Sequence, residues 1–162
     1  MQASCTLIYK RFPNDSDQLL NISRIITEIE TIDYDPKNQN IALLKHLLTD
    51  VFLDNGFVSG TALGNSHLTI NGLKHKTGLA IQTGNAARFY ADILKLQWLY
   101  KEKKIDNAIY VCLSKESSKE SYSSNLINIE RALREAEFFD KSKTEPKLYL
   151  TSFKKCITIS EG

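Results

Sequence analysis

The chain has few cysteines and no long apolar segment. Its three cysteines are widely spaced and form no C-x-x-C pair, so neither a zinc site nor a disulfide framework is expected. No apolar run approaches the roughly 20 residues that a membrane-spanning helix requires. The first residues also lack the long apolar core of a signal peptide. We therefore expect a cytoplasmic protein whose cysteines are buried or free thiols.

The chain also carries little net charge, +2 at pH 7, which does not by itself indicate an anionic partner. Basic clusters at 74–76 and 101–104 are more suggestive, although such runs usually form a solvated surface. The hydrophobic share of 42% and the length of 162 residues suit a globular protein with one core. We expect a single domain that spans residues 1–162.

Helical spacing of apolar residues dominates the first third of the chain. A strand is expected at 4–10, and a helix follows in which apolar residues recur at helical spacing over 19–29. Pro36 ends this helix, because the residue before a proline disfavours helical backbone. A second helix is expected from about 40 to 54, where the Asn-Gly pair at 55–56 stops it.

The middle of the chain changes to strand character. Residues 67–70 alternate between polar and apolar, Asn71-Gly72 is a strong turn signal, and 78–82 is expected to form the return strand. The later expected elements are a helix at 86–102, a buried strand at 105–113, a helix at 124–139 and strands at 147–151 and 154–160. This order predicts an α/β fold in which a mixed β-sheet is sandwiched between helices.

The segment Thr77-Gly-Leu-Ala-Ile-Gln-Thr-Gly-Asn85 is the most informative in the chain. It predicts a short strand followed by a polar turn. Successive side chains of a strand point to opposite faces, so Leu79 and Ile81 share one face while Ala80 and Gln82 share the other.

This segment and its neighbours resemble the BglII/BamHI-like type II restriction endonucleases, members of the PD-(D/E)XK nuclease superfamily. The resemblance covers about residues 66–152. Residues 79–85 resemble the family's acid-x-glutamine strand and the polar loop behind it. Asn71 falls nine residues before Ala80, where a BglII-type enzyme carries its first aspartate. Two later segments resemble the family's following buried strand and its late helix and strand, namely 105–111 and 123–150.

The resemblance implies a restriction-endonuclease-like fold and the magnesium-dependent hydrolysis of duplex DNA phosphodiesters. Its catalytic positions would be Asn71, Ala80 and Gln82, and acids at the first two would hold the metal against the scissile phosphate. Here Asn71 lacks the negative charge and Ala80 has no ligand atom. This leaves magnesium binding by the chain in doubt, and we expect little or no cleavage.

Three explanations of Ala80 are open. An engineered replacement of a native glutamate would allow DNA to be bound without being cut. Alternatively, the chain is a naturally non-catalytic DNA-binding or partner subunit of a restriction or defence system, for which Asn71 in the other acid position argues. In the third, the alignment is shifted and Asp54 supplies the first carboxylate. A nuclease of DNA repair with the same core is a further candidate function.

The resemblance also implies residues that contact DNA. The candidates are Lys74, Lys76, Thr83, Gly84, Asn85, Arg88 and Lys95. Thr83 to Asn85 would lie at a helix N-terminus, where backbone N–H groups suit a phosphate oxygen. Asn85 could instead cap that helix, and Arg88 and Lys95 could be simple surface positions. A homodimer is expected, because a two-fold protein matches a palindromic site.

Overall fold

The computed structural model describes residues 21–34, 38–113, 128, 131–132 and 134–135, together with the backbone of 147–153. The predicted strands at 4–10 and 154–160 and most of the predicted helix at 124–139 lie outside these ranges. Within the described ranges, no helix is both long enough and apolar enough to cross a membrane.

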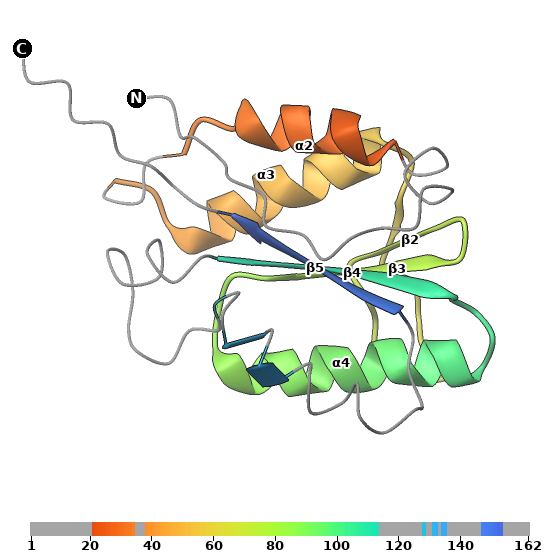
Figure 1. Ribbon diagram of the computed structural model, residues 1–162. Helices are drawn as coiled ribbons and strands as arrows, with labels where there is room; N and C mark the ends of the chain where they lie inside the picture. Colours follow the sequence, from red (N-terminus) through yellow and green to blue (C-terminus); the bar gives the residue numbers. More distant parts are fainter. Residues whose placement is uncertain are drawn as a thin grey trace, which may run out of the picture.

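A five-stranded mixed sheet forms the middle layer of the molecule (Figure 1). In spatial order its strands are β1 (Val58–Ser59), β2 (Gly72–Lys74), β3 (Thr77–Gln82), β4 (Asn107–Leu113) and β5 (Lys147–Phe153). β1, β2 and β3 pair antiparallel, whereas β3, β4 and β5 pair parallel. Parallel neighbours need a crossover, and helix α4 (Ala86–Lys101) supplies it between β3 and β4. The predicted α/β fold with a mixed sheet between helices is confirmed.

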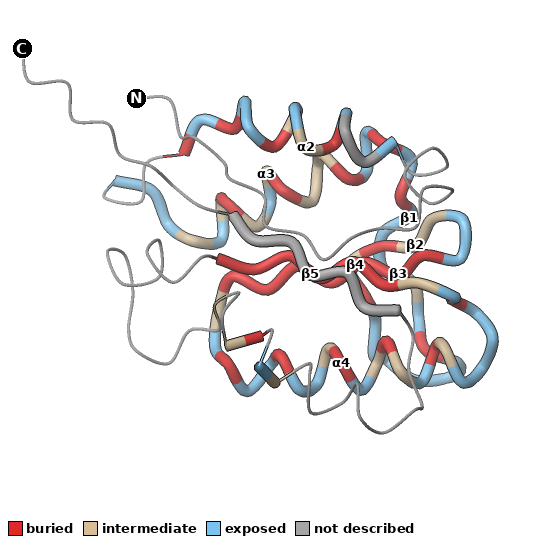
Figure 2. The backbone as a smooth tube through the Cα atoms, viewed as in Figure 1, coloured by how far each residue is buried: buried red, intermediate tan, exposed pale blue. Residues whose placement is uncertain are grey.

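Helices cover both faces of the sheet, so the central strands are buried on both sides (Figure 2). On one face, Leu79 and Ile81 pack with α2 (Ile22–Glu30) and α3 (Ile41–Asp54). On the other face, Ala80 packs with apolar residues of α4. The predicted alternation along β3 is therefore confirmed. Continuous burial of β3 is typical of a parallel sheet covered by helices on both sides.

The limits of α3 and α4 follow from their end residues. The Asn40 side chain accepts a hydrogen bond from the Leu43 backbone N–H at 2.9 Å and caps α3. The helix stops at Asn55, and Gly56 takes a left-handed φ of 85°, which glycine adopts without steric cost. The Asn85 side chain caps α4 by accepting from the Ala87 backbone N–H. Both helices thus match the predicted ranges closely.

The hairpin between β2 and β3 turns at His75-Lys76, so the predicted turn at Asn71-Gly72 is wrong. His75 and Lys76 have φ angles of 43° and 57°, as the two central residues of a type I′ turn require. Gly72 instead begins β2, where a Cβ atom would lie 3.2 Å from the Cβ atom of Phe57. This glycine permits a close approach of the backbone to a core side chain.

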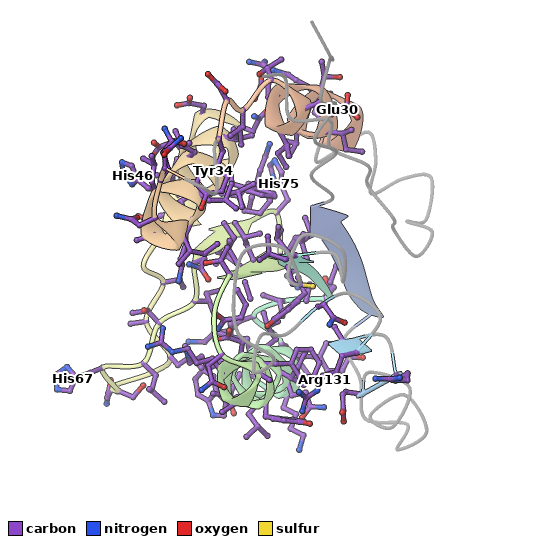
Figure 3. All side chains as sticks on the ribbon, turned by 90° about the vertical axis from the view of Figure 1, so that its left-hand side faces the viewer. Glu30, Tyr34, His46, His67, His75 and Arg131 are labelled. Atoms are coloured by element: carbon purple, nitrogen blue, oxygen red, sulfur yellow. The ribbon has the colours of Figure 1, made fainter. Side chains whose placement is uncertain are left out.

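The predicted strand at 67–70 is also wrong. In this segment Thr69 forms a single bridge with Ala62, and Leu68 is 56% exposed rather than facing the core. His67 projects away from the rest of the molecule (Figure 3). Strand β2 takes the place beside β3 that the sequence assigned to this segment, because Gly72 pairs with Leu79 and Lys74 pairs with Thr77.

Replacing His75 by Asn together with Lys76 by Gly is expected to raise the free energy of unfolding by about 1 kcal/mol, because both replacements tolerate left-handed backbone better than the native residues. Urea denaturation measures this change. As a control, Lys101→Gly places a glycine in ordinary helical backbone and should destabilise by up to about 1 kcal/mol. If both variants destabilise equally, the turn does not lie at residues 75–76.

Candidate functional site

Asn71, Ala80 and Gln82 converge at the carboxyl end of β3. The Asn71 backbone N–H donates to the Leu79 carbonyl at 3.0 Å, and the Asn71 Oδ1 atom accepts from the Ile81 N–H at 2.8 Å. The pairing of β2 with β3 therefore continues by one position, and Asn71 lies across from Ala80. Gln82 follows two residues later on the face that Ala80 occupies.

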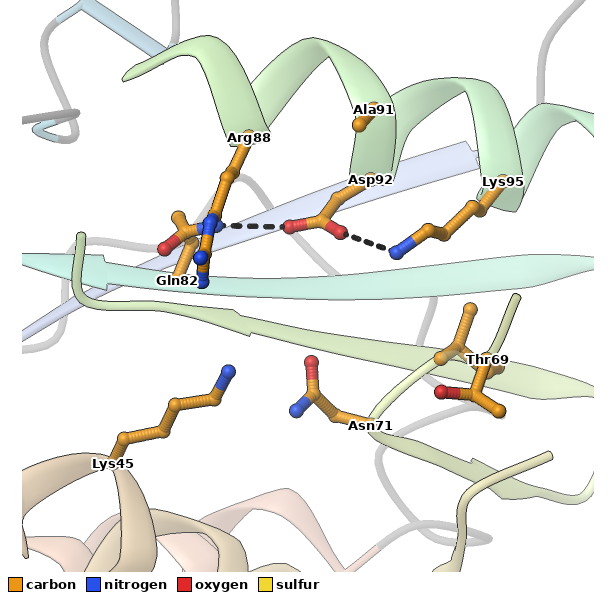
Figure 4. A pocket seen from close by; sticks show the side chains of 9 residues that line it. Lys45, Thr69, Asn71, Gln82, Arg88, Ala91, Asp92 and Lys95 are labelled. Atoms are coloured by element: carbon orange, nitrogen blue, oxygen red, sulfur yellow. Dashed lines mark hydrogen bonds and ion pairs between the residues drawn. The ribbon is translucent and has the colours of Figure 1, made fainter. Parts of the chain in front are cut away.

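A cavity of about 290 Å³ lies beside these positions, between α3, β3 and α4 (Figure 4). Its polar lining residues are Lys45, Thr69, Asn71, Gln82, Arg88, Asp92 and Lys95. Ala80 is only 2% exposed and packs in the apolar core on the α4 side. The position between the two amides thus contributes a buried methyl group where the resemblance would place an acid.

The amide oxygens of Asn71 and Gln82 are both bound to backbone N–H groups. Asn71 Oδ1 accepts from Ile81, and Gln82 Oε1 accepts from the Gly84 N–H at 2.9 Å. Gln82 consequently directs its amide nitrogen, a donor, toward Asp92 Oδ2 at 3.2 Å. Because magnesium takes oxygen ligands and commonly carboxylates, the side chains at positions 71, 80 and 82 do not fit this metal.

The other metal-ligating side chains among the described residues are scattered. The three histidines, His46, His67 and His75, lie apart from one another (Figure 3). Over the ranges that the structure describes, no group of three His, Cys, Asp or Glu side chains is arranged to hold a metal ion. Cys112 is a buried cysteine of β4. Within the described residues, the cavity beside β3 is therefore the place where the fit of a metal has to be judged.

Asp92 is the carboxylate of this cavity, and the sequence reasoning missed it. Asp92 Oδ1 lies 3.2 Å from Lys95 Nζ, and the two side chains are 15% and 23% exposed. A signal for this residue was present, because Arg88, Asp92 and Lys95 are spaced by four and three positions and share one helix face. Lys45 comes from α3, and no sequence spacing links it to α4.

Tyr110 forms the wall behind Ala80, its partner in the register of β3 with β4. Its ring packs edge-to-face on Phe89, with centroids 5.2 Å apart. Burial, followed by the negative charge of Asp92, raises the pKa of Tyr110 above its ordinary range. The Tyr110 phenol is therefore neutral at physiological pH. The electrostatic effect of Asp92 reaches this side chain, which lies behind Ala80.

The predicted DNA-contacting residues between β3 and α4 serve local structure. Thr83 is buried at 6% exposure, and the Gly84 N–H is the group that binds Gln82. Asn85 Oδ1 accepts from the Ala87 N–H at 2.8 Å, so the capping role considered for Asn85 is the one observed. A role of these residues in binding DNA stays a prediction.

Other predicted residues lie away from the cavity. Lys74 Nζ donates to the Asn55 carbonyl at 2.6 Å, at the end of α3. Lys76 occupies the hairpin turn, with its Nζ atom 3.7 Å from Asp106 Oδ2. Asp54 is exposed as the last residue of α3. Of the predicted cations, the cavity brings together Arg88 and Lys95 but neither Lys74 nor Lys76.

Comparison with known proteins gives this arrangement its context. The family model of restriction endonuclease BglII/BglIII matches residues 14–148. The crystal structure of restriction endonuclease BglII complexed with a DNA 16-mer matches with a TM-score of 0.71 and 9% identity, over 96% of this chain and 80% of that chain. The crystal structure of free BglII matches with a TM-score of 0.63 and 10% identity, over 96% and 82% of the two chains.

No curated protein sequence matches the chain. The two solved structures share the fold of this chain. Their sequence identity is too low to transfer the roles of individual residues to this chain. The family model covers most of the chain, from the residues before α2 to the second residue of β5. The chain therefore belongs to the BglII/BglIII family of restriction endonucleases.

Proposed function

We propose that the protein binds duplex DNA at the cavity beside β3 and does not hydrolyse it with the present sequence. One observation carries this proposal. Asn71 and Gln82 line a cavity together with Arg88 and Lys95, whereas the position between the two amides holds the buried methyl group of Ala80. Among the residues that the structure describes, the cavity thus offers cations that bind an anion, whereas positions 71 and 80 hold no acid for a catalytic metal.

DNA binding is supported by the charges around the cavity. Of the described residues, Lys45, Arg88 and Lys95 line it together with one acid, Asp92. Lysine and arginine contacts to phosphate oxygens position a protein on a duplex without reading its sequence. BglII, which shares the fold, has been crystallised with a DNA 16-mer. We place the activity in the cytoplasm, as expected for a restriction endonuclease family member.

The absence of hydrolysis follows from the ligands that magnesium needs. The metal lowers the pKa of a bound water and neutralises the charge that develops on the phosphate. Ala80 offers no ligand atom, and the oxygens of Asn71 and Gln82 already accept backbone N–H groups. We therefore do not expect the family's magnesium-dependent reaction from this chain.

Between the origins considered for Ala80, Asn71 favours a naturally non-catalytic subunit of a restriction or defence system. A single engineered change of a glutamate to Ala80 would account for one acid position only. The other acid position is also without a carboxylate, because it holds Asn71. Loss at both positions is what relaxed selection on catalysis would leave, while the fold and its basic cavity persist.

A homodimer is also part of the proposal. Tyr90, Leu94 and Trp98 are spaced four residues apart along α4 and are 36%, 61% and 36% exposed. They form an apolar stripe on one side of the helix. Burial of this stripe between two copies would remove apolar surface from water and give the two-fold symmetry that a palindromic DNA site requires.

The variant Asn71→Asp/Ala80→Glu is expected to gain magnesium-dependent cleavage of duplex DNA, at least about tenfold above the parent chain, since tenfold corresponds to about 1.4 kcal/mol of barrier. The two carboxylates would lie across from each other, one just before β2 and the other on β3. Cleavage is measured on plasmid and linear DNA with magnesium, with Ala80→Glu alone as an intermediate case.

Ala108→Glu is the matched control, because it buries a glutamate at a fully buried position on the neighbouring strand. Circular dichroism identifies the variants that fold. Cleavage by the parent chain would contradict its proposed lack of hydrolysis. A double variant that folds, binds DNA and remains inert would show that the two missing acids do not explain the loss.

Arg88→Ala is expected to weaken duplex binding about three- to tenfold, because it removes one exposed cation that lines the cavity. Fluorescence anisotropy with a labelled duplex measures the Kd. Lys101→Ala removes an exposed lysine at the other end of the same helix and should leave the Kd unchanged. Equal losses in both variants would indicate general attraction by charge rather than binding at the cavity.

Leu94→Asp is expected to convert a dimer into monomers, because it places a charge at the most exposed position of the stripe. Light scattering after size-exclusion chromatography measures the mass. Leu53→Asp is the control, since Leu53 is a 37% exposed leucine on α3. A parent chain that is monomeric at all concentrations, with and without DNA, would refute the dimer.

A further inference from the structure

We propose that the cavity beside β3 binds one DNA phosphate directly through Lys45, Arg88 and Lys95, with no divalent metal between protein and phosphate. This inference rests on the proposed DNA binding and adds to it the chemistry of the contact. In a metal-dependent nuclease site, acidic side chains bind a metal cation, and this cation contacts the phosphate. In this chain, side-chain cations themselves line the space.

The balance of charge in the cavity favours an anion. Asp92 binds Lys95 through one carboxylate oxygen and Gln82 through the other, so both oxygens are already engaged. Lys45 and Arg88 make no side-chain hydrogen bond or ion pair with the other residues that the structure describes. With Asp92 offset by Lys95, two positive charges remain to be balanced by a ligand.

The terminal groups of these cations point into the same space. Lys45 extends from α3, whereas Arg88 extends from α4 on the opposite side, beside Gln82 (Figure 4). Lys95 reaches the cavity two turns after Arg88 on the same helix. Cations from two facing helices can contact different oxygens of one phosphate, and the arginine fork can contact two of them at once.

The amide side chains add donors rather than metal ligands. Asn71 Oδ1 and Gln82 Oε1 accept hydrogen bonds from backbone N–H groups. The nitrogen of each amide therefore points away from the backbone group that its oxygen binds. The Asn71 nitrogen points toward Lys45 (Figure 4). A divalent cation placed here would meet amide donors and nearby ammonium groups, whereas a phosphate oxygen would accept from them.

The cavity also has sufficient volume. Its 290 Å³ is about ten times the roughly 30 Å³ that a water molecule occupies in the liquid. A phosphate group can therefore enter together with some of its hydration water. Lys95 and Asp92 are largely shielded from bulk solvent, at 23% and 15% exposure, and lower hydration strengthens a contact between a cation and a phosphate.

The first experiment measures the affinity of the full chain for a labelled duplex in EDTA and in magnesium at equal ionic strength. We expect the two Kd values to agree within about twofold. Binding at least about tenfold tighter in magnesium would overturn the metal-free contact while leaving the proposed DNA binding intact. No binding in either buffer would instead refute the DNA-binding function itself.

The second experiment tests for a defined phosphate site by competition. Inorganic phosphate should displace the duplex better than chloride at matched ionic strength, and Lys45→Gln and Lys95→Gln should abolish this difference. Each variant should also weaken duplex binding about three- to tenfold and lower the salt slope of log K by about one. Lys101→Gln, a charge-matched control outside the cavity, should behave as the parent chain does.

The outcomes separate the site from general electrostatic attraction. Phosphate that competes no better than chloride in the parent chain would overturn the proposal, as would a Lys101→Gln effect equal to that of Lys45→Gln. Phosphate that stabilises the parent chain against thermal unfolding without any duplex binding would refute the role in DNA binding and assign the cavity to free phosphate. Lys45 and Lys95 are partly exposed, and thermal melts verify that their variants fold.

Discussion

Burial of β3 on both faces is the constraint on which the site depends. All six residues of this strand are buried, and even Gly78 has no space for a side chain, since a Cβ atom would lie 2.9 Å from Leu96 Cδ2. Gln82 is polar and therefore needs partners inside this layer. It obtains them from the Gly84 N–H and from Asp92. The burial of β3 is thus the reason for the hydrogen bonds that link Gln82 to Asp92 and Asp92 to Lys95.

The same constraint explains why some features were predictable from the sequence. Alternation along β3 assigned Ala80 and Gln82 to one face, because a strand under two helical layers leaves little freedom for its side chains. Asn40 and Asn85 fixed the starts of α3 and α4 through local hydrogen bonds. Features that depend on neighbours in sequence were therefore accessible without a structure.

Other features depend on contacts between distant segments and could not be obtained in this way. Asn71-Gly72 has the composition of a turn, but Phe57 packs against Gly72 and the chain turns later, at residues 75–76. Lys45 joins the cavity only because α3 packs on the sheet. The spacing of Asp92 to Arg88 and Lys95 shows that the three residues share one helix face. No local rule predicts that this face lines a cavity.

The apolar stripe and the cavity use different sides of the same helix, and this separation gives the protein a built-in optical reporter. Trp98 is the single tryptophan of the chain. It contacts the Gly64 region and lies 5.6 Å from Lys104 Nζ, outside the cavity. Its intrinsic emission therefore comes from one known place, so a change in the environment of the stripe can be followed without any attached dye while the cavity is being filled.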